Sequence, residues 1–181
     1  MRVCAFFFFR APTFFAWPPH LRPHSSPSHT TSPSPKTRLW CEEIDLGEEK
    51  VRSVASGLRE HYTAEGMTGR LVVVVCNLKP RTMKGFASEG MVLCAKEGAG
   101  VAFVTPPEGS VVGERVLCSL IPEDVPWPVP EVINPAKEPN AWASVAQGLK
   151  TNGAGAACFS GSVLSTSAGP CTAPFNDAPI S

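Results

Sequence analysis

An unbroken apolar run at Leu71–Cys76, with the sequence LVVVVC, constrains the fold of this chain more than any other feature. β-Branched side chains favour extended backbone, and the run has the length of one strand, bounded by Gly69 and Pro80. Met91–Ala95 and Val101–Thr105 repeat the pattern and are separated by a glycine-containing turn. The chain is therefore expected to be built on short, buried strands.

Further short strands are predicted on either side of these three. Residues 40–46 alternate between apolar and polar side chains, except that Glu42 falls on the apolar face. Residues 114–120 form another candidate, and residues 51–55 form a weaker one. Five or six short strands separated by Gly and Pro turns predict an all-β barrel or sandwich.

The first 37 residues differ from the rest of the chain in charge and composition. They hold four basic residues and no acid, whereas the remainder holds 12 basic and 16 acidic residues, so the net charge of zero conceals a body of net −4. Residues 18–35 are rich in proline and serine and are predicted to be disordered. Residues 1–17 fit a secretory signal, an organelle transit peptide or an aberrant start. We expect a cytoplasmic protein, or an organellar one (mitochondrion or plastid) if this segment is a transit peptide.

The C-terminal part is predicted to be an extension that follows the barrel. Prolines between residues 126 and 135 favour an extended crossing segment, and Asn140 is expected to cap a short helix with an apolar stripe from Trp142 to Leu149. The tail after Thr151 is rich in Gly, Ser and Ala and either covers the barrel or frays. The expected organisation is a barrel at 38–125 and an extension at 126–181. The chain contains no apolar run of about 18 residues, so no membrane helix is predicted.

Residues 77–90, which link two of the predicted buried strands, carry the candidate chemistry. Lys79, Arg81 and Lys84 lie within six residues, and no acid occurs before Glu89. Clustered cations on a loop that strands hold in place are suited to phosphate backbones, because each contact releases counterions. A solvated basic loop without a ligand is the alternative from charge alone.

The same segment, NLKPRTMKGFASEGMVLCA, resembles the signature of the tRNA-binding domain family. That family includes C-terminal domains of methionyl- and tyrosyl-tRNA synthetases and an endothelial monocyte-activating polypeptide-like synthetase cofactor. Flanking pieces agree with the resemblance: LWCEEIDLGEEKVRSVASGLREHYTAEGMTGRLVVVV, VTPPEGSVVGERV and INPAKEPNAWASVAQGLKTN. The similarity covers residues 39–152 well and the tail only faintly.

The resemblance implies an oligonucleotide-binding (OB) barrel that holds tRNA through shape and backbone contacts. Carried over by position, Lys79, Arg81 and Lys84 would contact phosphates. Asn77 and Ser88 would hold the loop or reach ribose, and Met91 would pack in the barrel rather than meet RNA. The expected function is a non-catalytic tRNA-binding module that assists an aminoacyl-tRNA synthetase. The alternative is a protein-interaction module that docks synthetases or acts as a cytokine-like fragment.

Three departures from the family pattern affect this expectation. The family's first strand has no counterpart, because residues 30–38 read TTSPSPKTR, and an incomplete barrel exposes an edge. Residues 3–9 are not expected to replace that strand, because the proline-rich linker is extended and stiff. The lysine run of the cytokine-like branch is missing and the body is acidic, so RNA binding is predicted to be modest and salt-sensitive.

Catalytic and metal motifs are missing from the sequence. The seven cysteines form no C-x-x-C pair and are expected to be free thiols in a reducing compartment. Cys76 or Cys94 with His61 would be the only nucleophile–base pair, and both thiols fall in apolar strands. The acids from Glu42 to Glu49 are predicted to be a solvated strand edge. We therefore expect neither enzymatic activity nor a metal or cofactor, and the sequence leaves the oligomeric state open.

Overall fold

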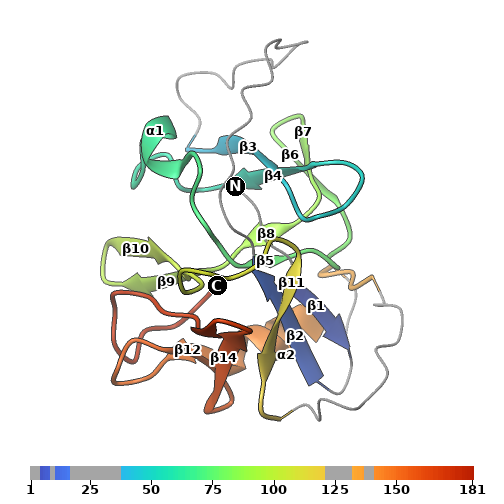
Figure 1. Cartoon of the computed structure of the whole chain (residues 1–181). Helices are drawn as coiled ribbons and strands as arrows, with labels where there is room; N and C mark the ends of the chain where they lie inside the picture. Colours follow the sequence, from blue (N-terminus) through green and yellow to red (C-terminus); the bar gives the residue numbers. More distant parts are fainter. Residues whose placement is uncertain (1–4, 9–10, 17–37, 121–131, 137–140) are drawn as a thin grey trace.

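The structure is a computed structural model that describes residues 5–8, 11–16, 38–120, 132–136 and 141–181. Most of these residues lie in or between short strands (Figure 1). Among the described residues, one nine-stranded sheet runs in the order β12-β13-β14-β11-β2-β1-β5-β8 with β15 on β14, and there are three further two-stranded pairs. This confirms the predicted all-β, barrel-like class. Within the described residues, no helix has the length and apolarity needed to cross a membrane.

The first predicted strand pair is present as an antiparallel hairpin. β3 (Trp40–Ile44) pairs with β4 (Arg52–Ser56), and Ile44 and Val54 are fully buried. Glu42 also lies on the inward face of β3, where Ser56 Oγ donates a hydrogen bond to Glu42 Oε1. The prediction of a solvated acidic edge is therefore wrong for Glu42, because the alternation of the strand turns its carboxyl group into the barrel.

The continuous apolar run forms the centre of the core. Residues 72–75 are fully buried, although regular pairing within the run is confined to β5 (Val74–Val75), which pairs with β8 (Met91–Val92). Isolated backbone hydrogen bonds extend the pairing beyond β5, as Leu93 N donates to Val73 O at 2.8 Å. The next strands along the chain are β9 (Cys94–Glu97), β10 (Gly100–Phe103) and β11 (Glu114–Cys118).

Two N-terminal strands lie between β5 and β11 in the main sheet. β1 (Ala5–Phe8) and β2 (Ala11–Ala16) form a hairpin in which β2 pairs with β11 and β1 makes one parallel contact with β5. This differs from our expectation that the segment would not replace the missing strand. The edges of β5 and β11 both need backbone partners, and an inserted hairpin supplies them. The predicted disorder of residues 18–35 falls outside the described residues.

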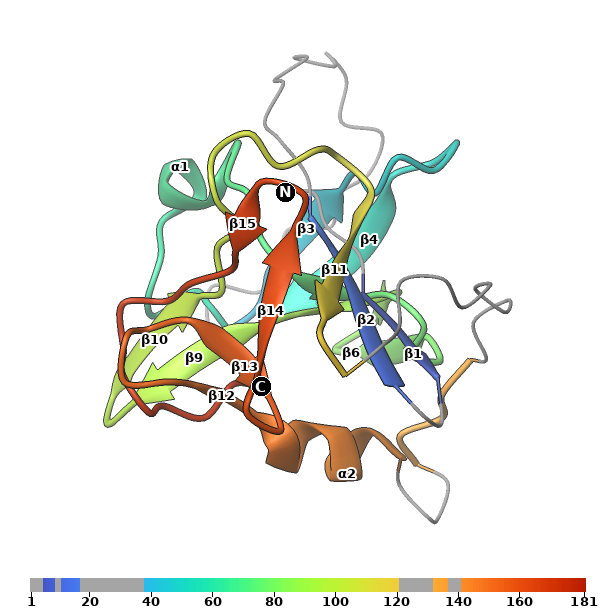
Figure 2. The same cartoon turned by 60° about the horizontal axis from the view of Figure 1, so that its bottom comes forward.

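The C-terminal tail covers the barrel and does not fray. Helix α2 (Ala141–Gly148) leads into β12 (Leu149–Thr151), β13 (Ala157–Phe159), β14 (Ser162–Thr166) and β15 (Gly169–Pro170). β14 pairs with β11, so the tail continues the main sheet (Figure 2). Leu149 and Ile180 are almost completely buried. The predicted helix is confirmed, while its proposed cap, Asn140, is outside the described residues.

A short helix, α1 (Ala64–Met67), lies between β4 and β5. Thr63 caps it, since its Oγ1 accepts a hydrogen bond from Gly66 N at 3.2 Å. Met67 is the buried residue of this turn and joins the core cluster. The turn thereby closes one side of the barrel next to Tyr62.

Candidate nucleic-acid interface

The basic segment at residues 77–90, predicted as a loop between two buried strands, contains a β-hairpin. β6 (Arg81–Met83) pairs with β7 (Phe86–Ser88), and Met83 lies opposite Phe86. Lys84 and Gly85 form a two-residue turn with φ values of 51° and 86°. Positive φ at both positions is the type I′ geometry, which matches the twist of paired strands.

The three predicted phosphate-contacting side chains are all exposed on this hairpin. Lys79 precedes β6, Arg81 begins it, and Lys84 occupies the turn. Within the described part of the chain, none of the three has an ion-pair partner. Their charges are therefore available to an external anion.

The other predicted site residues lie at the buried base of the hairpin. Asn77 and Ser88 are only 4% and 5% exposed, which suits holding the segment rather than reaching ribose. Ser88 Oγ accepts from Ala55 N at 3.0 Å and donates to Gly90 O at 2.9 Å. Met91 is half-buried against the core, in agreement with a packing role.

The C-terminal extension contacts the base of the hairpin, which sequence reasoning did not predict. Ile133 N donates to Asn77 O at 2.8 Å, and Lys79 N donates to Ile133 O at 2.7 Å. These two bonds place Ile133 beside Leu78 as a short parallel strand contact. Ile133 lies more than 50 residues away along the chain, and no local pattern in the sequence signals this pairing.

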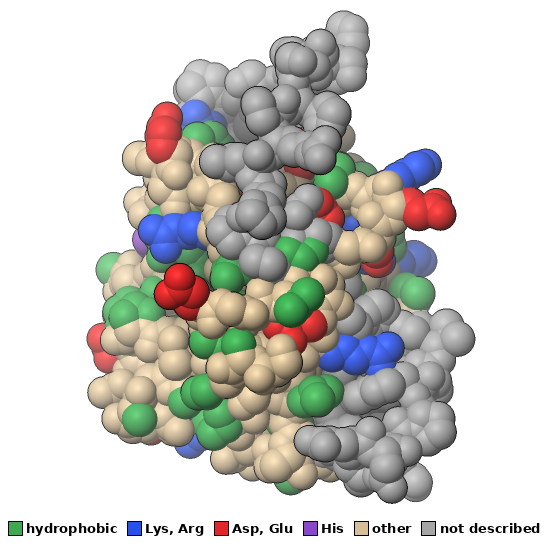
Figure 3. All heavy atoms as spheres, viewed as in Figure 1, with side chains coloured by type: hydrophobic (Ala, Val, Ile, Leu, Met, Phe, Trp, Pro, Cys, Tyr) green, Lys and Arg blue, Asp and Glu red, His purple; other side chains and the backbone are tan. Residues whose placement is uncertain are grey.

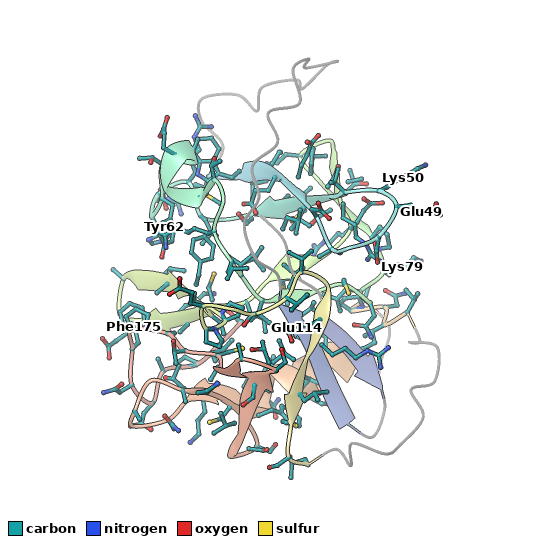
Figure 4. The ribbon with its side chains drawn as sticks, viewed as in Figure 1. Glu49, Lys50, Tyr62, Lys79, Glu114 and Phe175 are labelled. Carbon is teal, nitrogen blue, oxygen red and sulfur yellow. The ribbon has the colours of Figure 1, made fainter. Side chains whose placement is uncertain are left out.

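Acidic side chains surround the basic hairpin and limit its field. Figure 4 shows Glu49, Lys50 and Lys79 at the same edge of the molecule, and Figure 3 shows Lys/Arg and Asp/Glu side chains interspersed there. Glu89 follows β7, and its Oε2 accepts from Ser53 N at 3.2 Å. The interface is therefore a small basic patch on this hairpin and not an extended basic face.

The residues considered for catalysis do not come together as a reactive group. Cys94 is buried, and burial raises the pKa of its thiol to about 12, while Cys76 is in a disulfide. The prediction that all cysteines are free is therefore wrong for Cys76. His61 is exposed and lines a shallow pocket with Trp40 and Tyr62. The described residues also contain no cluster of three His, Cys, Asp or Glu side chains that could hold a metal ion.

Comparisons with known proteins agree with this geometry. Residues 30–115 match the model of a putative tRNA binding domain. The chain is 40% identical over 123 residues to "Aminoacyl tRNA synthase complex-interacting multifunctional protein 1" of Mus musculus, a match that covers 68% of this chain and 38% of the relative. It is 41% identical over 135 residues to "Probable methionine--tRNA ligase" of Oryza sativa subsp. japonica, which covers 74% of this chain and 16% of the relative.

A solved structure extends the similarity to the whole fold. The C-terminal domain of Plasmodium vivax p43 superposes with a TM-score of 0.74 at 27% identity, covering 99% of this chain and 97% of that domain. The chain thus has the length of that single domain but spans well under half of the two relatives named above.

Proposed function

Because residues 30–115 match the model of a putative tRNA binding domain, we propose that this chain is a non-catalytic module that binds tRNA through its phosphate backbone. One observation carries the proposal: Lys79, Arg81 and Lys84 are exposed on a structured hairpin and have no ion-pair partner among the described residues. Basic side chains on a fixed scaffold release counterions when they meet phosphates, and this release supplies sequence-independent affinity.

The partner that such a module would assist is an aminoacyl-tRNA synthetase. Relatives of this chain are named as tRNA ligases or as a synthetase-complex protein, and the match covers only a minor part of each. A weak tRNA-binding module beside a synthetase raises the local concentration of tRNA without new catalytic contacts. The buried thiol of Cys94, with its raised pKa, supports a role without chemistry of its own.

A titration with labelled tRNA tests the proposal. We expect measurable binding by fluorescence anisotropy at about 50 mM salt, with affinity falling steeply toward 200 mM. The double variant Lys79→Ala with Lys84→Ala should bind more weakly. The matched control is Lys96→Ala with Lys150→Ala, which removes the same charge from exposed positions on β9 and β12. Absence of binding by the unmodified chain, or equal losses in both double variants, would refute the proposal.

A docking role toward a synthetase is the second candidate. The mouse relative is named for interaction with a synthetase complex, and that is the observation in its favour. Against it, Trp142 on α2 is half-buried and packs on the barrel core, which leaves less of its side chain for a partner. Co-purification with a synthetase that survives high salt and treatment with RNase would favour docking over RNA binding.

A further inference from the structure

We propose that Arg52 is the positioning residue of the interface, because its guanidinium ties both ends of the basic hairpin to β4. The expected effect of Arg52 on RNA binding rests on the proposed function, whereas its contacts with the hairpin are seen directly in the structure. Arg52 lies outside the segment NLKPRTMKGFASEGMVLCA, in one of the flanking pieces that share the family resemblance, and was not among the predicted site residues.

The contacts of Arg52 use almost every donor of its side chain. Nη1 donates to Cys76 O at 2.5 Å and lies 3.3 Å from Glu89 O. On the other side, Nε and Nη2 donate to the two carboxylate oxygens of Glu48 at 2.7 and 2.6 Å. Only 25% of the Arg52 side chain is exposed. A bidentate carboxylate fixes the plane of a guanidinium, and therefore fixes where the remaining donors point.

The two carbonyl groups that Arg52 contacts lie on either side of the three exposed cations in the sequence. Cys76 is the residue before the hairpin segment, and Glu89 is the residue after β7. All three exposed cations lie between these two points. One side chain therefore joins the entry and the exit of the segment, whereas Ser88 secures only the exit.

Arg52 itself is poorly placed to bind phosphate. Its charge faces the Glu48 carboxylate, and its donors are already occupied by protein oxygens. Its effect on RNA would therefore pass through the geometry of Lys79, Arg81 and Lys84. Lysine cannot reproduce the arrangement, because an ammonium group lacks the planar fork that reaches a carboxylate and two carbonyls at once.

The test separates this positioning role from simple charge. Arg52→Lys keeps the charge but loses the fork, whereas Lys50→Ala removes an exposed cation two residues away without touching these contacts. We expect Arg52→Lys to weaken tRNA binding about tenfold, the equivalent of one lost charge-assisted hydrogen bond, and Lys50→Ala to weaken it less than about threefold. Hydrogen exchange should accelerate at the amides of β6 and β7 but not at Val73 or Leu93 in the barrel.

Glu48→Gln is the second variant and also serves if Arg52→Lys does not fold. If charge alone mattered, losing a carboxylate beside the hairpin would strengthen RNA binding. If Arg52 positions the hairpin, Glu48→Gln should weaken binding and accelerate exchange in β6 and β7. Unchanged exchange in the hairpin, or acceleration that is equal in the barrel, would overturn the inference. If the unmodified chain does not bind tRNA, the proposed function fails and the exchange data alone decide whether Arg52 holds the hairpin.

Discussion

The exposed cations of the basic hairpin and the buried polar residues at its base differ in exposure and in hydrogen bonding. The cations Lys79, Arg81 and Lys84 are exposed and have no ion-pair partner among the described residues. At the base, Asn77 and Ser88 are almost fully buried, and Ser88 is hydrogen-bonded to neighbouring backbone. The exposed cations are therefore expected to govern affinity for RNA, and the base is expected to govern stability.

This division explains why one short sequence signature contains two kinds of residue. Basic residues on a surface contribute little to folding, since exposed charges are well solvated. Buried hydroxyl and amide groups contribute little to binding, because a ligand cannot reach them. Replacing an exposed cation should therefore change RNA affinity, whereas replacing a buried polar residue should change the free energy of unfolding.

The largest effect is expected from removing all three exposed cations of the hairpin. The triple variant Lys79→Ala, Arg81→Ala, Lys84→Ala should lose about 100-fold in tRNA affinity, and the slope of log K against log salt should fall by about 2 to 3. Anisotropy titrations between about 50 and 200 mM salt measure both quantities. Thermal melting by circular dichroism should be nearly unchanged, and a large drop in the melting temperature would break the proposed division.

The base is tested next by Ser88→Ala. This change leaves Ala55 N and Gly90 O without the Ser88 hydroxyl, so we expect a loss of about 2 kcal/mol in the free energy of unfolding. Urea denaturation measures the loss. Thr82→Ala, at an exposed position of the same hairpin, is the matched control and should cost less than about 0.5 kcal/mol. Equal losses in the two variants would contradict the structural role of Ser88.

A third test addresses β3, where the side chain of Glu42 faces the barrel. Burial raises the pKa of this carboxyl group from an ordinary value of 4.5 to about 7, against the opposing effect of the Ser56 hydrogen bond. Between these values the folded chain keeps a proton that the unfolded chain has released. The free energy of unfolding should therefore fall as the pH rises from 4.5 to 7, by about 2 kcal/mol.

Glu42→Gln removes this dependence and should be more stable than the unmodified chain above pH 7. Urea denaturation at pH 5 and at pH 8 measures the difference. Glu43→Gln is the control, because Glu43 is exposed on the same strand and its replacement should leave the pH dependence in place. A pH dependence that persists in Glu42→Gln would place its origin elsewhere. tRNA affinity should not change in either variant beyond the effect of one charge.

The sequence predicts strands well where the alternation or the run of side chains is apolar. The β3–β4 hairpin, the buried run at 72–75 and β11 follow from such patterns. β14 was not predicted, because two of its inward-facing residues are polar. Ser162 and Thr166 are buried at 9% exposure and are hydrogen-bonded to Ser119 and Ser110, so the strand carries no continuous apolar signal.

Contacts between distant segments were also beyond prediction. The insertion of β1 and β2 between β5 and β11 depends on which edges remain unpaired after the rest of the barrel has formed. The pairing of Ile133 with Leu78 similarly depends on the path of the extension. For the candidate site, charge and spacing indicated the three cations, and their assignment to phosphates came from the family resemblance. The hairpin geometry and the Arg52 contacts required the structure.

The smallest expected effect comes from the turn, where Lys84 both carries a charge and adopts a left-handed backbone conformation. Lys84 has a φ of 51°, a region that costs energy for most side chains and that asparagine tolerates well. Lys84→Asn should therefore raise the free energy of unfolding by about 0.5 kcal/mol while weakening tRNA binding about threefold. Lys84→Ala loses the same charge without the gain in turn geometry and is the control. If Lys84→Asn gains stability and loses affinity, the charge at this position serves the ligand and not the fold. If Lys84→Asn loses both stability and affinity, the lysine stabilises the turn.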